Sequence, residues 1–206
     1  MARIENKVLI LFAHPAQGRS EVNVHMARVA EWVPGVTLVD LYGEYPVFDI
    51  DVDAEQARLN DHDVLIFLHP LYWYSTPAIL KEWQDLVLEY GYAYGTDGTA
   101  LKGKTFLSAV TTGGPAEAYR AEGYNHFTLR ELMAPLQQMA DLCGMHWVPP
   151  FVMHGARHAK ESGEIEGHLD TWEHLLEALV EGRLDLSGAR DLETLNPALD
   201  LLIQEV

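Results

Sequence analysis

DVLIFLHPLYWYSTPAILKEW, residues 63–83, places an apolar run, an aromatic loop and the start of a helix in direct succession. Residues 64–68 are all apolar, which is typical of a strand buried on both faces of a parallel sheet. Pro77 suits the start of the following helix, because its fixed φ fits there and its missing N–H needs no partner. The stretch therefore predicts a strand–loop–helix unit.

The loop of this unit holds three adjacent aromatic residues, Tyr72, Trp73 and Tyr74. Loops at the carboxyl end of a strand are where open α/β sheets bind ligands. An aromatic cluster there suits a flat, apolar ring. The loop alone does not separate this function from aromatic rings that only cover the core.

Four more strands and several helices follow from the apolar pattern elsewhere in the chain. The strands are expected at residues 7–13, 36–42, 104–111 and 147–153, the last interrupted by Pro149 and Pro150 and therefore at an edge. Helices are expected after Ser20 as N-cap, from Asp53 to Asn60, after Pro77, from about residue 129 or 135 to 143, and over residues 169–181. Five strands alternating with helices predict a parallel sheet covered on both faces.

The composition is that of a globular chain with an acidic surface. The 206 residues are 48% hydrophobic, and their number suits one domain with a sizeable core. A net charge of −17 argues against nucleic acid or an anionic membrane surface as the main partner, since both require a basic face. The single cysteine, Cys143, excludes an internal disulfide and is expected in the core.

The chain shows neither a signal-peptide hydrophobic region nor an apolar run of membrane-spanning length. We therefore expect a soluble, cytoplasmic protein. We expect residues 1–182 to form an α/β domain and residues 183–206 to be a C-terminal extension that packs on its own or a neighbouring subunit.

Residues 98–105, GTALKGKT, match the phosphate loop of nucleotide hydrolases. That loop works between a strand and a helix, whose N-terminal amides hold the phosphates. Here a helix precedes the match and the predicted strand at residues 104–111 follows it. We therefore do not expect an ATP or GTP site.

A better phosphate candidate is the connection between the first strand and its helix. Ser20 and Asn23 stand at the predicted helix start, where free N–H groups and the helix dipole favour an anion, and Arg19 adds positive charge. Taken alone, the same residues are better explained by Ser20 capping the helix and Asn23 pointing to water.

The position of three loops in the predicted sheet favours a ligand. In a flavodoxin-like doubly wound five-stranded parallel sheet of order 2-1-3-4-5, FMN lies at the switch point between the first and third strands. The loop at Ser20 follows the first strand, the aromatic loop follows the third, and residues 111–114 (TTGG) follow the fourth. Together they predict an FMN site, with FAD as the alternative.

Several short motifs also carry a resemblance to a known family. These motifs are AHP at residues 13–15, HPLYWY at 69–74, AYG at 93–95, ALKGK at 100–104 and TTGG at 111–114. Together they resemble the NAD(P)H:quinone reductase family that includes DT-diaphorase. Within it the chain is most similar to the Kef-type ancillary proteins of bacterial glutathione-gated potassium efflux antiporters. The likeness spans residues 7 to about 180.

The resemblance implies roles for particular residues. The FMN phosphate and ribityl chain would be bound by His14, Ser20, Glu21, Val22 and Asn23. The isoalloxazine would be bound by Leu71, Tyr72, Trp73, Tyr74, Thr111, Thr112, Gly113 and Gly114. Tyr119 matches a family tyrosine at the pyrimidine edge of the flavin. The family's proton-relay histidine should lie near Asn125, but the spacing to Pro135 is one residue longer, so His126 is the natural substitute, with a surface-loop histidine as the alternative.

The resemblance implies an FMN-dependent NAD(P)H:quinone oxidoreductase that works by ping-pong, two-electron hydride transfer. It also implies a homodimer whose partners are a quinone and NAD(P)H. The alternative is a flavin-bound regulatory subunit of a potassium efflux antiporter, held at the inner face of the cell membrane by that protein. We expect no metal site, because Gly155 and a loop context weaken a shared helical face for His154 and His158, and no acid or cysteine completes a metal set with them.

Overall fold

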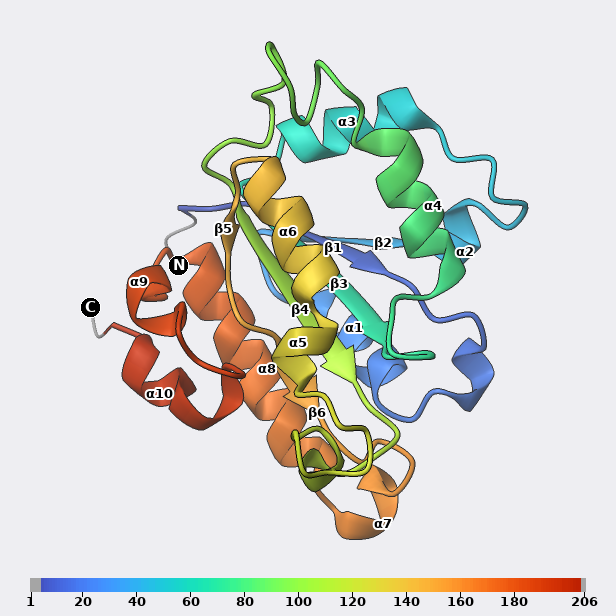
Figure 1. The fold of residues 1–206 in the computed structure, drawn as a ribbon, viewed down its shortest axis with the longest axis vertical. Helices are drawn as coiled ribbons and strands as arrows, with labels where there is room; N and C mark the ends of the chain where they lie inside the picture. The colour runs from blue at the N-terminus through green and yellow to red at the C-terminus, as the bar shows by residue number, and fades with distance from the viewer. Residues whose placement is uncertain (1–4, 205–206) are drawn as a thin grey trace.

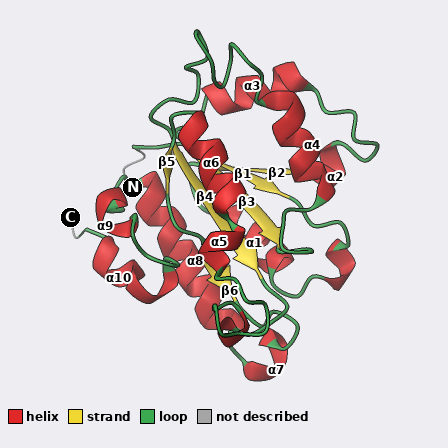
Figure 2. Ribbon diagram, in the orientation of Figure 1, coloured by secondary structure: helices red, strands yellow, loops and turns green. Residues whose placement is uncertain are grey.

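The computed structural model describes residues 5–204 and shows a parallel sheet between two layers of helices (Figures 1 and 2). The strand order is β2-β1-β3-β4-β5, and β6 also pairs with β4. The strands are β1 Val8–Phe12, β2 Val36–Asp40, β3 Val64–Pro70, β4 Thr105–Thr111, β5 His146–Trp147 and β6 Phe151–Met153. The predicted fold class and the order 2-1-3-4-5 are therefore confirmed.

The last strand differs from its expected form. Instead of one interrupted strand over residues 147–153, β5 and β6 are separate short strands that both pair with β4. Pro149 and Pro150 lie between them and supply no N–H for a ladder. The second strand also ends earlier than expected, at Asp40, because α2 (Leu41–Glu44) begins directly after it.

The main helices are α1 Asn23–Ala30, α3 Val52–Asn60, α4 Ala78–Val87, α6 Ala134–Leu142 and α8 Ile165–Val180. One predicted N-cap and one predicted helix start were wrong. Val22, not Ser20, occupies the N-cap position of α1, although the Ser20 hydroxyl still accepts a hydrogen bond from Val24 N at 3.3 Å. Asp51, not Asp53, caps α3 through a hydrogen bond from Ala54 N. In both cases the capping geometry depends on backbone angles that spacing does not reveal.

The two faces of the sheet build two cores, because side chains along a strand alternate between faces. Ile10 belongs to the core under α1 and α8, with Met26 and Trp172. Leu9 belongs to the core under α4 and α6, with Trp83. Cys143 is buried in this second core, as expected. No helix within residues 5–204 is both long and apolar enough to cross a membrane.

The C-terminal segment packs on the first of these cores. It contains α9 (Leu186–Ala189) and α10 (Leu199–Leu202), and Leu195 and Leu199 are buried beside α8. Its Asn196 side chain pairs with the free edge of β6: Val152 N donates to Asn196 Oδ1 at 2.8 Å, and Asn196 Nδ2 donates to Val152 O at 3.0 Å. An amide side chain thus takes the place of a neighbouring strand at this edge.

Candidate functional site

Two adjoining cavities lie at the carboxyl ends of the parallel strands. The helix cavity, of about 350 Å³, lies at the start of α1, and the aromatic cavity, of about 950 Å³, lies beside the loop after β3. Leu71, Tyr72, Gly113 and Arg157 line both, so the two cavities are continuous. Parallel strands bring the loops after β1, β3, β4 and β6 to this one edge.

The cavities contain every residue that the sequence assigned to a cofactor. The helix cavity is lined by His14, Ser20, Glu21, Val22, Asn23, Leu71, Tyr72, Thr111, Thr112 and Gly113. The aromatic cavity adds Trp73, Tyr74, Gly114 and Tyr119. The structure thus brings these residues together, while their binding roles stay a prediction.

Asn23 presents an unsatisfied donor in the helix cavity. Its side chain is only 2% exposed, and its Oδ1 accepts a hydrogen bond from Thr111 Oγ1 at 2.8 Å. This contact fixes the orientation of the amide. Among the described residues, Nδ2 has no hydrogen-bond partner. A buried donor left unpaired costs about 1–3 kcal/mol, so an acceptor on a bound molecule would remove this cost.

His14 is a neutral donor in the same cavity. Burial lowers its pKa, so the ring is neutral at pH 7. Its Nδ1 accepts a hydrogen bond from Ala16 N at 3.1 Å, so the proton of the neutral ring is on Nε2. The edge of the ring also contacts Tyr72, with centroids 5.9 Å apart. His14 therefore joins the helix cavity to the aromatic loop.

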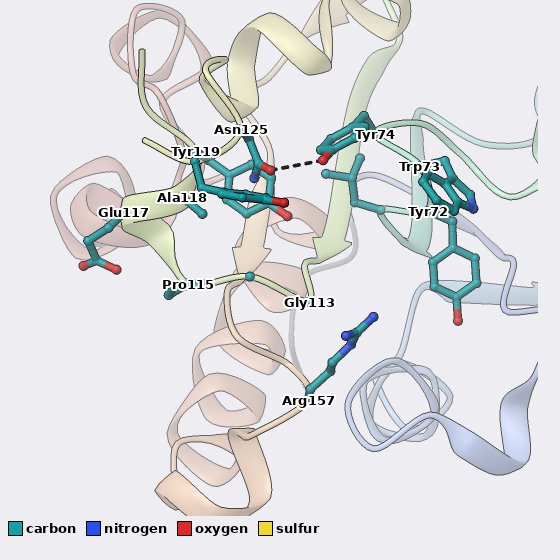
Figure 3. A pocket seen from close by; sticks show the side chains of 13 residues that line it. Tyr72, Trp73, Tyr74, Gly113, Pro115, Glu117, Ala118, Tyr119, Asn125 and Arg157 are labelled. Carbon is teal, nitrogen blue, oxygen red and sulfur yellow. Dashed lines mark hydrogen bonds between the residues drawn. The ribbon is translucent and has the colours of Figure 1, made fainter. Parts of the chain in front are cut away.

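Arg157 is a site residue that the sequence analysis missed. It lies between the two cavities, and Figure 3 shows its guanidinium directed toward the space between Gly113 and Tyr72. A Cβ added to Gly113 would lie 3.2 Å from Arg157 Nε, so the glycine leaves room for this side chain. Its place after the last strand, at the ligand-binding edge, is the feature that could have identified it.

The aromatic loop is held in a strained turn. Tyr72 and Ser75 exchange two backbone hydrogen bonds of 3.1 and 3.0 Å across a two-residue turn, and both central residues, Trp73 and Tyr74, have positive φ (50° and 62°). Such turns normally contain Asn or Gly, and the conformation costs roughly 1–3 kcal/mol for each other residue. The indole of Trp73 is nevertheless 94% exposed. Its exposed position therefore excludes a role in core packing.

Tyr119 lies over a small polar network at the floor of the aromatic cavity. Its ring is 5.5 Å from that of His154, and His154 Nδ1 is 3.1 Å from the Thr112 hydroxyl. Thr112 donates its proton to Gly114 O at 2.9 Å, which leaves its oxygen to accept from His154. Burial lowers the pKa of His154 despite the nearby Glu117 carboxylate. The ring of this histidine is therefore neutral at pH 7 and donates from Nδ1 to the Thr112 hydroxyl.

His126 lies outside the aromatic cavity. It is exposed, has a φ of 61°, and lines a neighbouring cavity of about 460 Å³, which shares Tyr74, Tyr124 and Asn125 with the aromatic cavity. Its neighbour Asn125 instead lines the aromatic cavity with Tyr119 and accepts a hydrogen bond from Tyr74 Oη at 3.1 Å (Figure 3). The role assigned to His126 stays a prediction that this placement does not support.

The phosphate-loop match lies away from these cavities. Residues 98–105 precede and enter β4 at its amino end, the edge of the sheet opposite the site, and no helix follows them directly. Lys104 Nζ donates to the carbonyl of His62. Across the described part of the chain, no group of three or more His, Cys, Asp or Glu side chains is placed to hold a metal ion.

Comparison with known proteins finds a match to a family described as having a flavodoxin-like fold, over residues 6–176. The glutathione-regulated potassium-efflux system ancillary protein KefG of Cronobacter sakazakii is 44% identical over 82% of this chain and 92% of its own length. General stress protein 14 of Treponema denticola, solved in complex with FMN, is 38% identical with a TM-score of 0.79, over 84% of this chain and 99% of its own. An NADPH-quinone reductase from P. pentosaceus is 32% identical with a TM-score of 0.74, over 82% of this chain and 96% of its own.

Proposed function

Because the chain belongs to the flavodoxin-like-fold family matched over residues 6–176, and within it to the Kef-type quinone reductases, we propose that it is an FMN-dependent NAD(P)H:quinone oxidoreductase. The observation that carries the proposal is the buried, unpaired Nδ2 of Asn23 in a cavity continuous with an aromatic one. FMN has a phosphate, a polar ribityl chain and a flat ring, which need these two environments side by side.

The residues of the helix cavity fit the polar part of FMN. Asn23 Nδ2 and His14 Nε2 are neutral donors, and the start of α1 supplies backbone N–H groups and the positive end of its dipole. Arg19 and Arg157 add positive charge in a protein whose net charge is −17. These groups would bind a phosphate, and no positively charged side chain would be left buried without a partner.

The residues of the aromatic cavity fit the flavin ring. Trp73 and Tyr74 form one wall, and Gly113 and Gly114 let backbone approach closely on another. Bound FMN supplies hydride acceptance and donation, while the protein orients the reactants. Tyr119 lies opposite the wall formed by Trp73 and Tyr74. Its hydroxyl would donate a hydrogen bond to an oxygen of the flavin that gains negative charge on reduction.

The shape of the aromatic cavity supports a ping-pong order. A volume of about 950 Å³ is at the upper end of the range for small-molecule sites, so it has room for a ring and one further planar reactant. The nicotinamide and the quinone would therefore use the same place in turn.

The exposed aromatics at the mouth of the cavity support a homodimer. Tyr124 and Phe127 are 86% and 55% exposed and line one cavity with Tyr74. Aromatic side chains of this kind are enriched in protein interfaces. We propose that a second copy covers them, which light scattering would test: a dimer mass is expected, and a monomer mass at working concentration would contradict it.

A second candidate function is that of an ancillary subunit of a potassium efflux antiporter, supported by the 44% identity to KefG. The protein would then be cytoplasmic and held at the membrane by its protein partner. Co-purification with a tagged antiporter from solubilised membranes tests this role. If the protein does not co-purify with the antiporter but keeps its oxidoreductase activity, it acts as a reductase without this partner.

For the domain organisation we propose that residues 1–182 are the FMN-binding unit and residues 183–206 an extension packed on it. The family match ends at residue 176, before the segment that contains Asn196. Truncation after residue 182 would uncover the β6 edge and so favour association of chains.

The main proposal is tested by purifying the protein and following its flavin spectrum. We expect a yellow protein that releases FMN on denaturation, is bleached by NADPH or NADH, and is reoxidised by a quinone. FAD in place of FMN would contradict only the cofactor. A protein that holds flavin but turns over negligibly with every quinone would favour the ancillary role.

A further inference from the structure

Asn125 is fixed at the rim of the aromatic cavity by backbone contacts on both sides. Its own N–H donates to Ala118 O at 3.0 Å, and His126 N donates to Gly123 O at 3.1 Å. The left-handed backbone at His126 turns that side chain away, whereas the Asn125 amide lies among the cavity side chains (Figure 3). The loop therefore presents an amide, not an imidazole, to a bound ring.

Tyr74 fixes the orientation of this amide. Its hydroxyl donates to Asn125 Oδ1 at 3.1 Å, across the mouth of the cavity from the strained turn. Since Oδ1 is occupied, Nδ2 is the atom left to interact with a bound molecule, and no described residue is recorded as accepting from it. Asn125 and Tyr119 both line the aromatic cavity, and Figure 3 draws the Asn125 amide beside Tyr119.

Two neutral donors thus share one side of the cavity: Asn125 Nδ2 and the Tyr119 hydroxyl. An amide does not ionise or transfer a proton near pH 7, so it recognises an oxygen by hydrogen bonding alone. A planar ring with a carbonyl oxygen fits this pair. A ring without such an oxygen would leave both donors unpaired, which is the basis of strong discrimination between substrates.

We propose that Asn125 is a specificity-determining residue that selects ring carbonyl compounds by donating its Nδ2–H to the carbonyl oxygen, with Tyr74 as its positioning residue. The inference rests on the proposed function, because it concerns the electron acceptor of the same site. It names the acceptor class as planar cyclic ketones and quinones, and it assigns no proton transfer to this position.

The test is a binding titration of the FMN-loaded protein with menadione in the absence of NAD(P)H, followed by the flavin absorbance. Asn125→Ala should raise the dissociation constant roughly tenfold, the worth of one hydrogen bond of about 1.4 kcal/mol. Asn125→Asp should weaken binding further, since a carboxylate repels the carbonyl oxygen. Tyr74→Phe should weaken binding about threefold, and this effect should vanish in the Asn125→Ala background.

The chain contains a matched control pair away from the site. Tyr92 Oη donates to Asn60 Oδ1 at 3.1 Å, the same distance as between Tyr74 and Asn125, and also lies 3.0 Å from Gln56 O. Asn60→Ala and Tyr92→Phe should leave menadione binding unchanged. An Asn125→Ala protein that holds FMN and binds menadione as wild type does would overturn this inference and leave the proposed function intact. A wild-type protein that takes up no flavin would overturn both.

Discussion

Two buried polar clusters in this protein differ in whether the protein completes them. Glu55 is fully buried under α4, and its carboxylate accepts hydrogen bonds from Tyr45 Oη at 2.7 Å, Trp83 Nε1 at 2.8 Å and Arg58. Asn23 is equally buried, yet Nδ2 of its amide has no partner among the described residues. The comparison separates a cluster whose polar atoms are satisfied within the protein from one that leaves a buried donor unpaired beside a cavity, which is the arrangement expected if a ligand completes it.

The largest expected effect is on the Glu55 cluster. Glu55→Gln keeps the volume but removes the charge that pairs with Arg58, so the free energy of unfolding should fall by about 3 kcal/mol. Urea unfolding measures this change. Glu44→Gln is the control: its exposed ion pair with Arg58 should contribute under about 1 kcal/mol. FMN affinity of the folded Glu55→Gln protein should equal that of wild type, and a loss of affinity would break the comparison.

His69 and His168 provide a third case for this comparison. Each is buried with an unpaired Nε2, but neither lines the helix cavity or the aromatic cavity. Burial lowers the pKa of His69 and of His168 from 6.5 to about 4. Below pH 6.5 the unfolded chain therefore binds protons that the folded protein does not. Stability is then lost as the pH falls from about 6.5 to about 4, by about 2 kcal/mol per histidine at pH 5.

His168→Phe tests this dependence, since the ring already stacks on Phe151 at 4.6 Å. Urea unfolding at pH 7 and pH 5 should show a loss of stability that is smaller by the roughly 2 kcal/mol that His168 contributes at pH 5. Exposed His174 provides the control, because His174→Phe should keep the wild-type dependence. An unchanged pH dependence in His168→Phe would mean that an unpaired buried nitrogen carries no such penalty here.

Relieving the strain in the aromatic turn should raise the free energy of unfolding and lower the affinity for FMN. Trp73→Gly removes the left-handed strain and little buried surface, so unfolding of the flavin-free protein should require about 1 kcal/mol more. FMN affinity should fall by roughly threefold to tenfold, since aromatic contacts contribute about 0.5–1.5 kcal/mol. Flavin titration of Lys104→Ala, at the discarded phosphate-loop match, should equal wild type. If Lys104→Ala weakens FMN binding more than Trp73→Gly does, residues 98–105 take part in binding the phosphate.

The smallest structural change with a predicted kinetic effect is Tyr119→Phe. Its hydroxyl would be needed mainly when charge develops, so stopped-flow reduction by NADPH should slow about tenfold while FMN affinity changes less. Tyr124→Phe, on the exposed rim, provides a comparison within the same loop. Equal reduction rates in wild type and Tyr119→Phe would make Tyr119 a packing residue.

The features of the site that follow from the order of the strands could be predicted from the sequence. The apolar run at residues 64–68 marks a central strand, and the order of strands then places the loops at Ser20, Leu71 and Thr111 on one edge. For this reason, residues far apart in the chain could be assigned to one site without any contact being known.

The features of the site that depend on local backbone conformation could not be predicted from the sequence. Whether Asn125 or His126 faces the cavity depends on a left-handed turn at His126, which the residue types do not encode. The turn at Trp73 contains neither Asn nor Gly, so turn chemistry could not identify it. Arg157 belongs to no motif, and only its place after the last strand, at the ligand-binding edge of the sheet, connects it to the site.

The most direct test of the central claim, that the Asn23 donor is kept for a flavin, is an FMN titration of flavin-free wild type, Asn23→Leu and Glu55→Gln. Wild type and Glu55→Gln should bind one FMN per chain with equal affinity. Asn23→Leu should bind at least tenfold more weakly, while its own free energy of unfolding changes by less than about 1 kcal/mol. Equal FMN affinity in wild type and Asn23→Leu, or no FMN binding by wild type, would contradict the account.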